Sequence, residues 1–268
     1  MATLVAFHAH PDDECIMQSG SLAKASAEGH RVVVVYATGG EVGQVADGFL
    51  DPGETLVERR RREAQRSAEL LGVSRVVWLG YRDSGMMGTP DNDDPSCFWR
   101  ADVDEAAARV AEILRDERAD VLTIYDENGN YGHPDHIQVH RAGARAADLA
   151  GTPSVLELTI SRDHLRRLMG EALASGLPAD GMPDLDDPDL VFGMPEAVIT
   201  TTVDVRDWID SKRASMEAHA SQVQDTGPLL AMPPDSFLAG LGWEFYIRRG
   251  VPAGHRDDDV FAGVDLVR

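Results

Sequence analysis

The stretch TLVAFHAHPDDE, residues 3–14, runs from apolar residues directly into two histidines, a proline and three acidic residues. Its apolar part predicts a strand, and the segment of small residues over 18–30 predicts a helix. RVVVVYATGG (residues 31–40) is then long and apolar enough to be a strand that is buried on both faces. The first 40 residues therefore predict a β-α-β unit whose first strand ends in titratable groups.

The same alternation of apolar strands and helical segments continues to about residue 160. Further strands are expected over 74–80, 119–126 and 154–161, and further helices over 55–72, 102–118 and after 132–136. This pattern predicts an α/β fold with a three-layer α/β/α, doubly wound, mostly parallel Rossmann-like sheet. Ligands of such sheets bind beyond the carboxyl ends of the strands, near a topological switch point.

The composition changes from about residue 177. Residues 177–196 are rich in Pro, Gly and Asp and predict a long loop or cover, followed by a helix over 204–222 and a late strand over 243–250. We expect one domain. It has a Rossmann-like core over 1–175 and a C-terminal elaboration over 176–268 that shapes a substrate pocket.

Composition excludes several classes of protein. The 268 residues carry a formal net charge of −21, which repels phosphate backbones and argues against a nucleic-acid partner. There is no apolar run of about 18 residues, so no membrane span is expected. The N-terminal stretch lacks the basic segment of a signal peptide, which predicts a cytoplasmic location. Cys15 and Cys97 are expected to be free thiols. Nothing in the sequence indicates the oligomeric state.

The first candidate site is the sequence HPDD. If the chain leaves the strand into a first helical turn, His10 and Asp13 share a face and can converge on one cation. Pro11 stiffens that turn. Asp12 points elsewhere, and a carboxylate beside a metal but outside its coordination sphere suits the deprotonation of a water molecule.

The second candidate site, NGNYGHPDH, follows the strand predicted over 119–126. It contains Tyr131, His133, Asp135 and His136. Two histidines and one carboxylate with open positions form a common catalytic zinc or iron site. Each cluster alone also fits a capped helix start, but both together, each after a predicted strand, predict a shared metal site.

These motifs support a resemblance to a known family. AHPDDE, GHPDH and the order of elements between them are similar to the LmbE-like (PIG-L type) zinc-dependent N-deacetylases. RRREAQRSAELLGV and LGYRDSGMMG resemble the actinobacterial members of mycothiol metabolism, a deacetylase of N-acetylglucosaminyl-inositol and an amidase of mycothiol conjugates. The resemblance covers residues 3–150 well and the C-terminal third loosely. It implies an amidohydrolase that acts on a small N-acyl amino sugar.

Carried over by position, the resemblance implies zinc bound by His10, Asp13 and His136, with Asp12 as the general base. A site of two histidines and one aspartate also accepts iron(II), cobalt or nickel.

Beside the metal, the resemblance implies a protonated His133 that stabilises the oxyanion or protonates the leaving amine. Asp135 would raise the pKa of that imidazole, and Tyr131 would assist at the oxyanion.

Substrate contacts are predicted from the same comparison and from position. Arg60 matches an arginine that grips the substrate, although a run of four arginines is usually solvated or paired with Glu58 and Glu63. Asp83 matches a hydroxyl-binding carboxylate. Glu41, with Thr38, follows a predicted strand and is expected at the pocket rim.

Several weaker signals have a structural interpretation. His219 and Gln222 resemble a family segment near the pocket, but a helix surface is the default expectation. Met86 and Met87 are expected to serve packing.

The main hypothesis is a zinc-dependent N-deacetylase of an N-acetylglucosamine-type substrate. The alternatives within the class are a mycothiol S-conjugate amidase and an amino-sugar deacetylase of specialised metabolism. Two alternatives belong to other classes of protein. One is a metal-bound binding protein without turnover. The other is a Rossmann-type nucleotide enzyme, and the missing G-x-G-x-x-G spacing argues against it.

Overall fold

Within the described residues, seven strands form one sheet. The computed structural model describes residues 1–174, 184–187 and 190–265. The strands are β1 (Thr3–His8), β2 (Arg31–Thr38), β3 (Arg75–Tyr81), β4 (Val121–Tyr125), β5 (Ser154–Thr159), β6 (Thr201–Asp204) and β7 (Trp243–Arg248), in the spatial order β3-β2-β1-β4-β5-β7-β6. The first five strands are parallel, and β7 runs antiparallel to both β5 and β6. The predicted fold class is confirmed, although β6 was not predicted.

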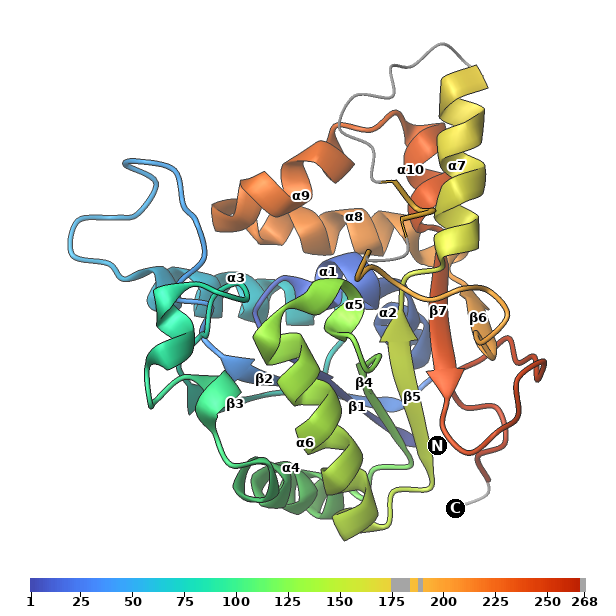
Figure 1. The fold of residues 1–268 in the computed structure, drawn as a ribbon, viewed down its shortest axis with the longest axis horizontal. Coiled ribbons are helices and arrows are strands. Elements are labelled where there is room, and N and C mark those ends of the chain that lie inside the picture. Colours follow the sequence, from blue (N-terminus) through green and yellow to red (C-terminus); the bar gives the residue numbers. More distant parts are fainter. Residues whose placement is uncertain (175–183, 188–189, 266–268) are drawn as a thin grey trace.

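Helices cover both faces of the sheet (Figure 1). They are α1 (Asp13–Met17), α2 (Ser19–Ala27), α3 (Leu56–Leu71), α4 (Val103–Glu117), α5 (Gly129–Gly132), α6 (Pro134–Ala150), α7 (Arg162–Ala174), α8 (Ile209–Ala218), α9 (Val223–Leu230) and α10 (Pro234–Leu241). One face carries α1, α2, α3 and α8, and the other carries α4 and α6. The layers are therefore helix, sheet and helix, as expected.

Local sequence explains where the best-predicted helix begins and ends. In α3, Thr55 accepts from the backbone N–H of Glu58, whose side chain accepts from the N–H of Thr55 in return. Gly72 ends the helix in the left-handed conformation, with φ 70°. The helix predicted over 204–222 is instead divided, because short 3₁₀ turns flank α8 on both sides. Helices α7, α9 and α10 were not predicted.

Close packing places α6 over the centre of the sheet. A Cβ atom on Gly143 would lie 2.4 Å from Ile124 Cγ2 in β4, so only glycine allows this approach. Neighbouring α6 residues Val139, Ala142 and Ala146 are fully buried in the main core. The beginning of α6 is thereby held at the carboxyl end of β4.

The chain reverses its direction of travel along the sheet between β1 and β4. From β1 it moves outward through β2 to β3, and then returns to β4 on the other side of β1. The carboxyl ends of β1 and β4 therefore form the topological switch point, where ligands of such sheets bind. Both clusters singled out in the sequence lie here. None of the helices in the described ranges is both long and apolar enough to cross a membrane.

Candidate functional site

A pocket of about 610 Å³ opens at the switch point. Its lining includes His10, Asp12 and Asp13 from the loop after β1, and His133 and His136 from the start of α6. The two loops predicted to face each other therefore do so.

The loop after β1 has an unusual backbone conformation. Asp12 adopts φ 106°, ψ −26°, a left-handed conformation that non-glycine residues rarely adopt. Strain of this kind costs about 1–3 kcal/mol and is concentrated at functional sites. The turn is closed by the backbone N–H of His10, which donates to Asp13 Oδ2 at 2.7 Å. Asp13 then begins α1.

The second loop is also tightly folded. His133 caps α6, with its Nδ1 accepting from the backbone N–H of Asp135 at 3.1 Å, and Pro134 occupies the first helical position. Gly129 has φ 61° and packs so closely that a Cβ atom would lie 2.7 Å from the Cβ of His136. The position of the His136 imidazole is fixed further by stacking on Tyr125, with 4.2 Å between ring centroids.

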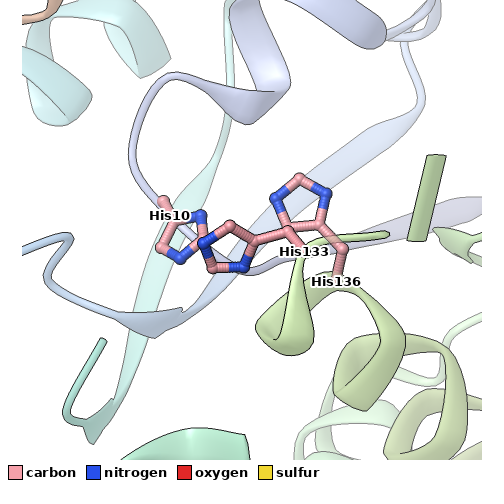
Figure 2. A group of neighbouring side chains, drawn as sticks. All are labelled: His10, His133 and His136. Atoms are coloured by element: carbon pink, nitrogen blue, oxygen red, sulfur yellow. The ribbon is translucent and has the colours of Figure 1, made fainter. Parts of the chain in front are cut away.

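Three imidazoles gather between these loops. One nitrogen each of His10, His133 and His136 lies within 4.8 Å of the others, so the group is able to hold a metal ion (Figure 2). Asp13 lies against two of them, with its Oδ2 3.4 Å from His10 Nδ1 and its Oδ1 3.3 Å from His136 Nε2. Ligand atoms around tetrahedral zinc lie about 3.4 Å apart. The spacings of Asp13 from His10 and from His136 therefore fit the ligand set of His10, Asp13 and His136 that the resemblance implied.

A second group of possible ligands lies on the other side of the His10 ring. It contains His10, Asp83, His133 and Asp135. Its two carboxylates already accept hydrogen bonds from protein donors. Asp135 accepts from the backbone N–H and the hydroxyl of Ser84, and Asp83 accepts from the backbone N–H of Gly85 at 2.8 Å. Both oxygens of each of these carboxylates accept from backbone or hydroxyl donors. Asp13 accepts from a backbone N–H at Oδ2, but its Oδ1 faces His136 Nε2 at 3.3 Å, so we favour His10, Asp13 and His136 as the ligand set.

Asp135 does not have its expected position. Its carboxylate faces His10 Nε2 at 3.1 Å, and only its backbone N–H reaches His133. Burial and the nearby imidazoles of His10 and His136 lower the pKa of His133 to about 2. The Asp135 carboxylate therefore does not pair with His133 to raise its pKa, in contrast to what the resemblance implied. The reason is the helix, because residues two apart on it do not face each other.

Asp135 is instead placed to orient His10, one of the candidate metal ligands. A carboxylate on the distal nitrogen of a histidine ligand fixes the tautomer of the ring and strengthens metal binding. We expect Asp135→Asn to weaken zinc binding by about 10- to 100-fold without unfolding the protein. Competition with a chromophoric chelator measures this change. An unchanged zinc affinity would contradict the assigned role.

Arg60 is buried against the proposed base. Its guanidinium, in a side chain only 3% exposed, donates to Asp12 Oδ1 at 2.8 Å, to Gly40 O at 2.8 Å and to Pro11 O. Burial raises the pKa of the Asp12 carboxyl to about 7, although Arg60 opposes this change. The alternative to the predicted substrate contact, a solvated Arg60 or one paired with Glu58 or Glu63, is not what the structure shows. Arg60 does line the pocket, but its two terminal nitrogens donate within the protein, and only its buried Nε has no hydrogen-bond partner among the described residues.

The other predicted contacts have different positions. Asp83 lines the pocket, and its Oδ1 lies 3.5 Å from His10 Nε2. Thr38 and Glu41 are not among the described residues that line it, and Val42, Gly43 and Gln44 are. The prediction that Thr38 and Glu41 reach the rim is therefore not met. The Thr38 hydroxyl turns inward to donate to Ala9 O at 3.1 Å.

Tyr131 lies at the mouth of the pocket. It is 40% exposed, and its hydroxyl is 3.4 Å from His136 Nε2. Met86 and Met87 are 47% and 51% exposed, so the expectation that they serve packing is wrong, and Met86 also lines the pocket. Two exposed side chains, Tyr131 and Met86, thus line the pocket together with its polar base.

The C-terminal part contributes more to the site than its sequence indicated. Gln222 is buried and lines the pocket. His219 is fully buried, with its Nε2 2.6 Å from Glu14 Oε1, so the expectation of a helix surface is wrong. Burial opposes ionisation of Glu14, but the charge of His219 outweighs it and lowers the pKa of Glu14 to about 2. The resemblance of residues 218–222, AHASQ, to a family segment near the pocket was the signal in the sequence that indicated this C-terminal contribution to the site.

Comparison with known proteins agrees with this geometry. The family described as PIG-L, GlcNAc-PI de-N-acetylase, matches residues 5–147, a range that contains both loops of the site. The chain belongs to the PIG-L family. It is thus an amide hydrolase of the deacetylase type.

PIG-L relatives match nearly the whole chain. A 1D-myo-inositol 2-acetamido-2-deoxy-alpha-D-glucopyranoside deacetylase from Acidothermus cellulolyticus is 40% identical, over 99% of this chain and 96% of its own length. A protein of the same name from Geodermatophilus obscurus is also 40% identical, over 97% of both chains.

A solved structure shares the PIG-L fold. The N,N'-diacetylchitobiose deacetylase from Pyrococcus horikoshii superimposes with a TM-score of 0.59 at 23% identity, covering 92% of this chain and 83% of its own. At this identity the likeness supports the fold alone.

Proposed function

We propose that this chain is a zinc-dependent N-deacetylase that hydrolyses the N-acetyl amide of N-acetylglucosaminyl-inositol to a free amine and acetate. The placement of the Asp12 carboxylate beside the donor set of His10, Asp13 and His136, at the base of one pocket, carries this proposal. The substrate is taken from the names of relatives that are similar over almost their whole length.

In this proposal His10, Asp13 and His136 hold the zinc ion. A bound zinc ion supplies Lewis-acid chemistry, because it polarises a carbonyl and makes water more acidic. Asp12 accepts the proton of the attacking water, and the Arg60 guanidinium holds the carboxylate in place through Oδ1. The other oxygen of Asp12 is left to take the proton.

His133 acts as a neutral imidazole. Because its Nδ1 accepts from the backbone N–H of Asp135, the ring proton is on Nε2. An N–H in this position is suited to donate a hydrogen bond to the developing oxyanion while keeping its proton. The proton that Asp12 took from the attacking water is then the one that passes to the leaving amine. Tyr131, at the mouth, is placed to assist with its hydroxyl.

The positions of the polar side chains at the pocket suggest their roles toward the substrate. Arg60 holds Asp12 in place, and Asp83, which lines the pocket, accepts a hydrogen bond from a sugar hydroxyl. Glu41 is not among the described residues that line the pocket, so it has no proposed contact with the substrate. The small-molecule substrate is the only partner that we propose. We also propose a cytoplasmic location, which the two free, buried thiols of Cys15 and Cys97 support.

Acetate release tests the proposed activity directly. We expect zinc-loaded protein to release acetate from N-acetylglucosaminyl-inositol at least about tenfold faster than from N-acetylglucosamine, because the inositol fills more of the pocket. An enzymatic acetate assay measures both rates. Cleavage of a bimane-labelled mycothiol conjugate, with no acetate released from either sugar, would instead indicate the amidase.

A further inference from the structure

A buried carboxylate lies directly behind the proposed base and has no part in the mechanism above. Glu14 is 1% exposed, and its Oε2 accepts from the backbone N–H of Asp12 at 3.0 Å. Its Oε1 accepts from the hydroxyl of Ser67 at 2.7 Å and lies 2.6 Å from His219 Nε2. One oxygen is therefore committed to the Asp12 backbone and the other to two donors from distant parts of the chain.

This contact holds the strained residue of the site. Asp12 has φ 106°, and its backbone N–H is the group that Glu14 engages. Arg60 holds the same turn from the pocket side through Pro11 O and Asp12 Oδ1. Without an acceptor for its N–H, the Asp12 peptide has less to oppose relaxation of its left-handed conformation.

The partners of Glu14 come from the helical layer that covers one face of the sheet. Ser67 lies in α3, and its hydroxyl is also 2.7 Å from the hydroxyl of Ser215 in α8. His219 ends α8 and is fully buried. Figure 1 shows α8 packed beside both α3 and α1. Through Ser67 and His219, Glu14 thus joins α3 and α8 to the turn that carries Asp12.

We propose that Glu14, held by His219 and Ser67, is a positioning residue that keeps Asp12 in its catalytic conformation. This inference rests on the proposed function, in which Asp12 is the base. His219 is not among the described residues that line the pocket, and its contact toward the catalytic loop is with Glu14. Its charge also lowers the pKa of Asp12 directly, an effect that His219→Gln and His219→Leu remove alike. Its substitution is expected to change turnover rather than substrate binding.

Two substitutions of His219 test this inference. His219→Leu removes the donor, and we expect kcat for acetate release to fall by about 10- to 100-fold, with KM and the zinc-to-protein ratio unchanged. His219→Gln keeps a donor near the position of Nε2 and is expected to restore most of the rate. In metal-free protein, the amide hydrogen of Asp12, followed by NMR, is expected to exchange faster in His219→Leu than in wild type or His219→Gln.

Lys212→Met is the matched control. It removes another buried ion pair of α8, between Lys212 Nζ and Glu244 Oε1 at 2.6 Å, which leads to the start of α2 and not to Asp12. We expect it to lower Tm as His219→Leu does, but to leave kcat and Asp12 exchange unchanged. Equal losses of kcat in His219→Leu and Lys212→Met would overturn the inference, because the loss of activity would then be explained by the lower stability of both variants.

A further variant tests the inference if His219→Leu does not fold. Ser67→Ala removes the second donor to Glu14 Oε1, and we expect kcat to fall by about 3- to 10-fold, with faster exchange at Asp12. Unchanged kcat and exchange in this variant would overturn the inference. Wild-type protein that releases no acetate would overturn the proposed function instead, and the exchange measurements would still test the role of Glu14.

Discussion

Replacing Asp12 with asparagine is expected to lower kcat for acetate release by about 10²- to 10⁴-fold, which is the usual contribution of a general base. This corresponds to about 3–5 kcal/mol of transition-state stabilisation. Asparagine has nearly the same shape and can still accept from Arg60 through its Oδ1, so the turn is retained. What is lost is the carboxylate that accepts the proton. Zinc content, measured on the same sample, should be unchanged because Asp12 is not in the proposed ligand set.

The control for this substitution is Asp104→Asn. Asp104 lies on the exposed surface of α4, where it pairs with Arg145 at 2.8 Å, remote from the pocket lining. This variant should keep the wild-type rate. If Asp12→Asn retained a rate within a few-fold of wild type, with zinc bound, the assignment of the base would be wrong.

The second large effect separates the two possible metal groups. His136 belongs only to the favoured set, with its Nε2 3.3 Å from Asp13 Oδ1, whereas Asp83 belongs only to the group on the far side of His10. We expect His136→Ala to weaken zinc binding by more than about 100-fold, since loss of a direct ligand exceeds the usual effect of an outer partner. Acetate release should be lost with it.

Asp83→Ala is the matched variant and should keep its zinc. Calorimetric titration of metal-free protein measures both affinities. The opposite result, with zinc lost in Asp83→Ala and kept in His136→Ala, would move the metal to the other side of the His10 ring.

The parts of the site that could be predicted are those fixed by local sequence. Buried strands, the helix expected from Thr55 and the two loops after β1 and β4 each follow from residues close together in the chain. Parallel strands bring their carboxyl ends to one edge, so the meeting of the two loops followed from the predicted fold.

The parts that could not be predicted depend on side-chain direction and on contacts between distant segments. Asp135 is only two positions from His133 in sequence, yet the start of α6 turns its carboxylate to His10. Arg60 was one of four consecutive arginines, and only the packing of α3 directs it to Asp12. His219 meets Glu14 across 205 positions of sequence, a contact that no local pattern indicates.

The position of β7 in the sheet also has a consequence for synthesis. His136, the last of the proposed ligands, leaves the ribosome long before β7 does. Yet β7 is the strand that pairs with β5 and, through Glu244, accepts from the backbone N–H groups of Gly20 and Ser21 at the start of α2. Until residue 248 has been made, the nascent chain holds a complete set of ligands beside an unpaired edge at β5, the condition in which strands associate wrongly.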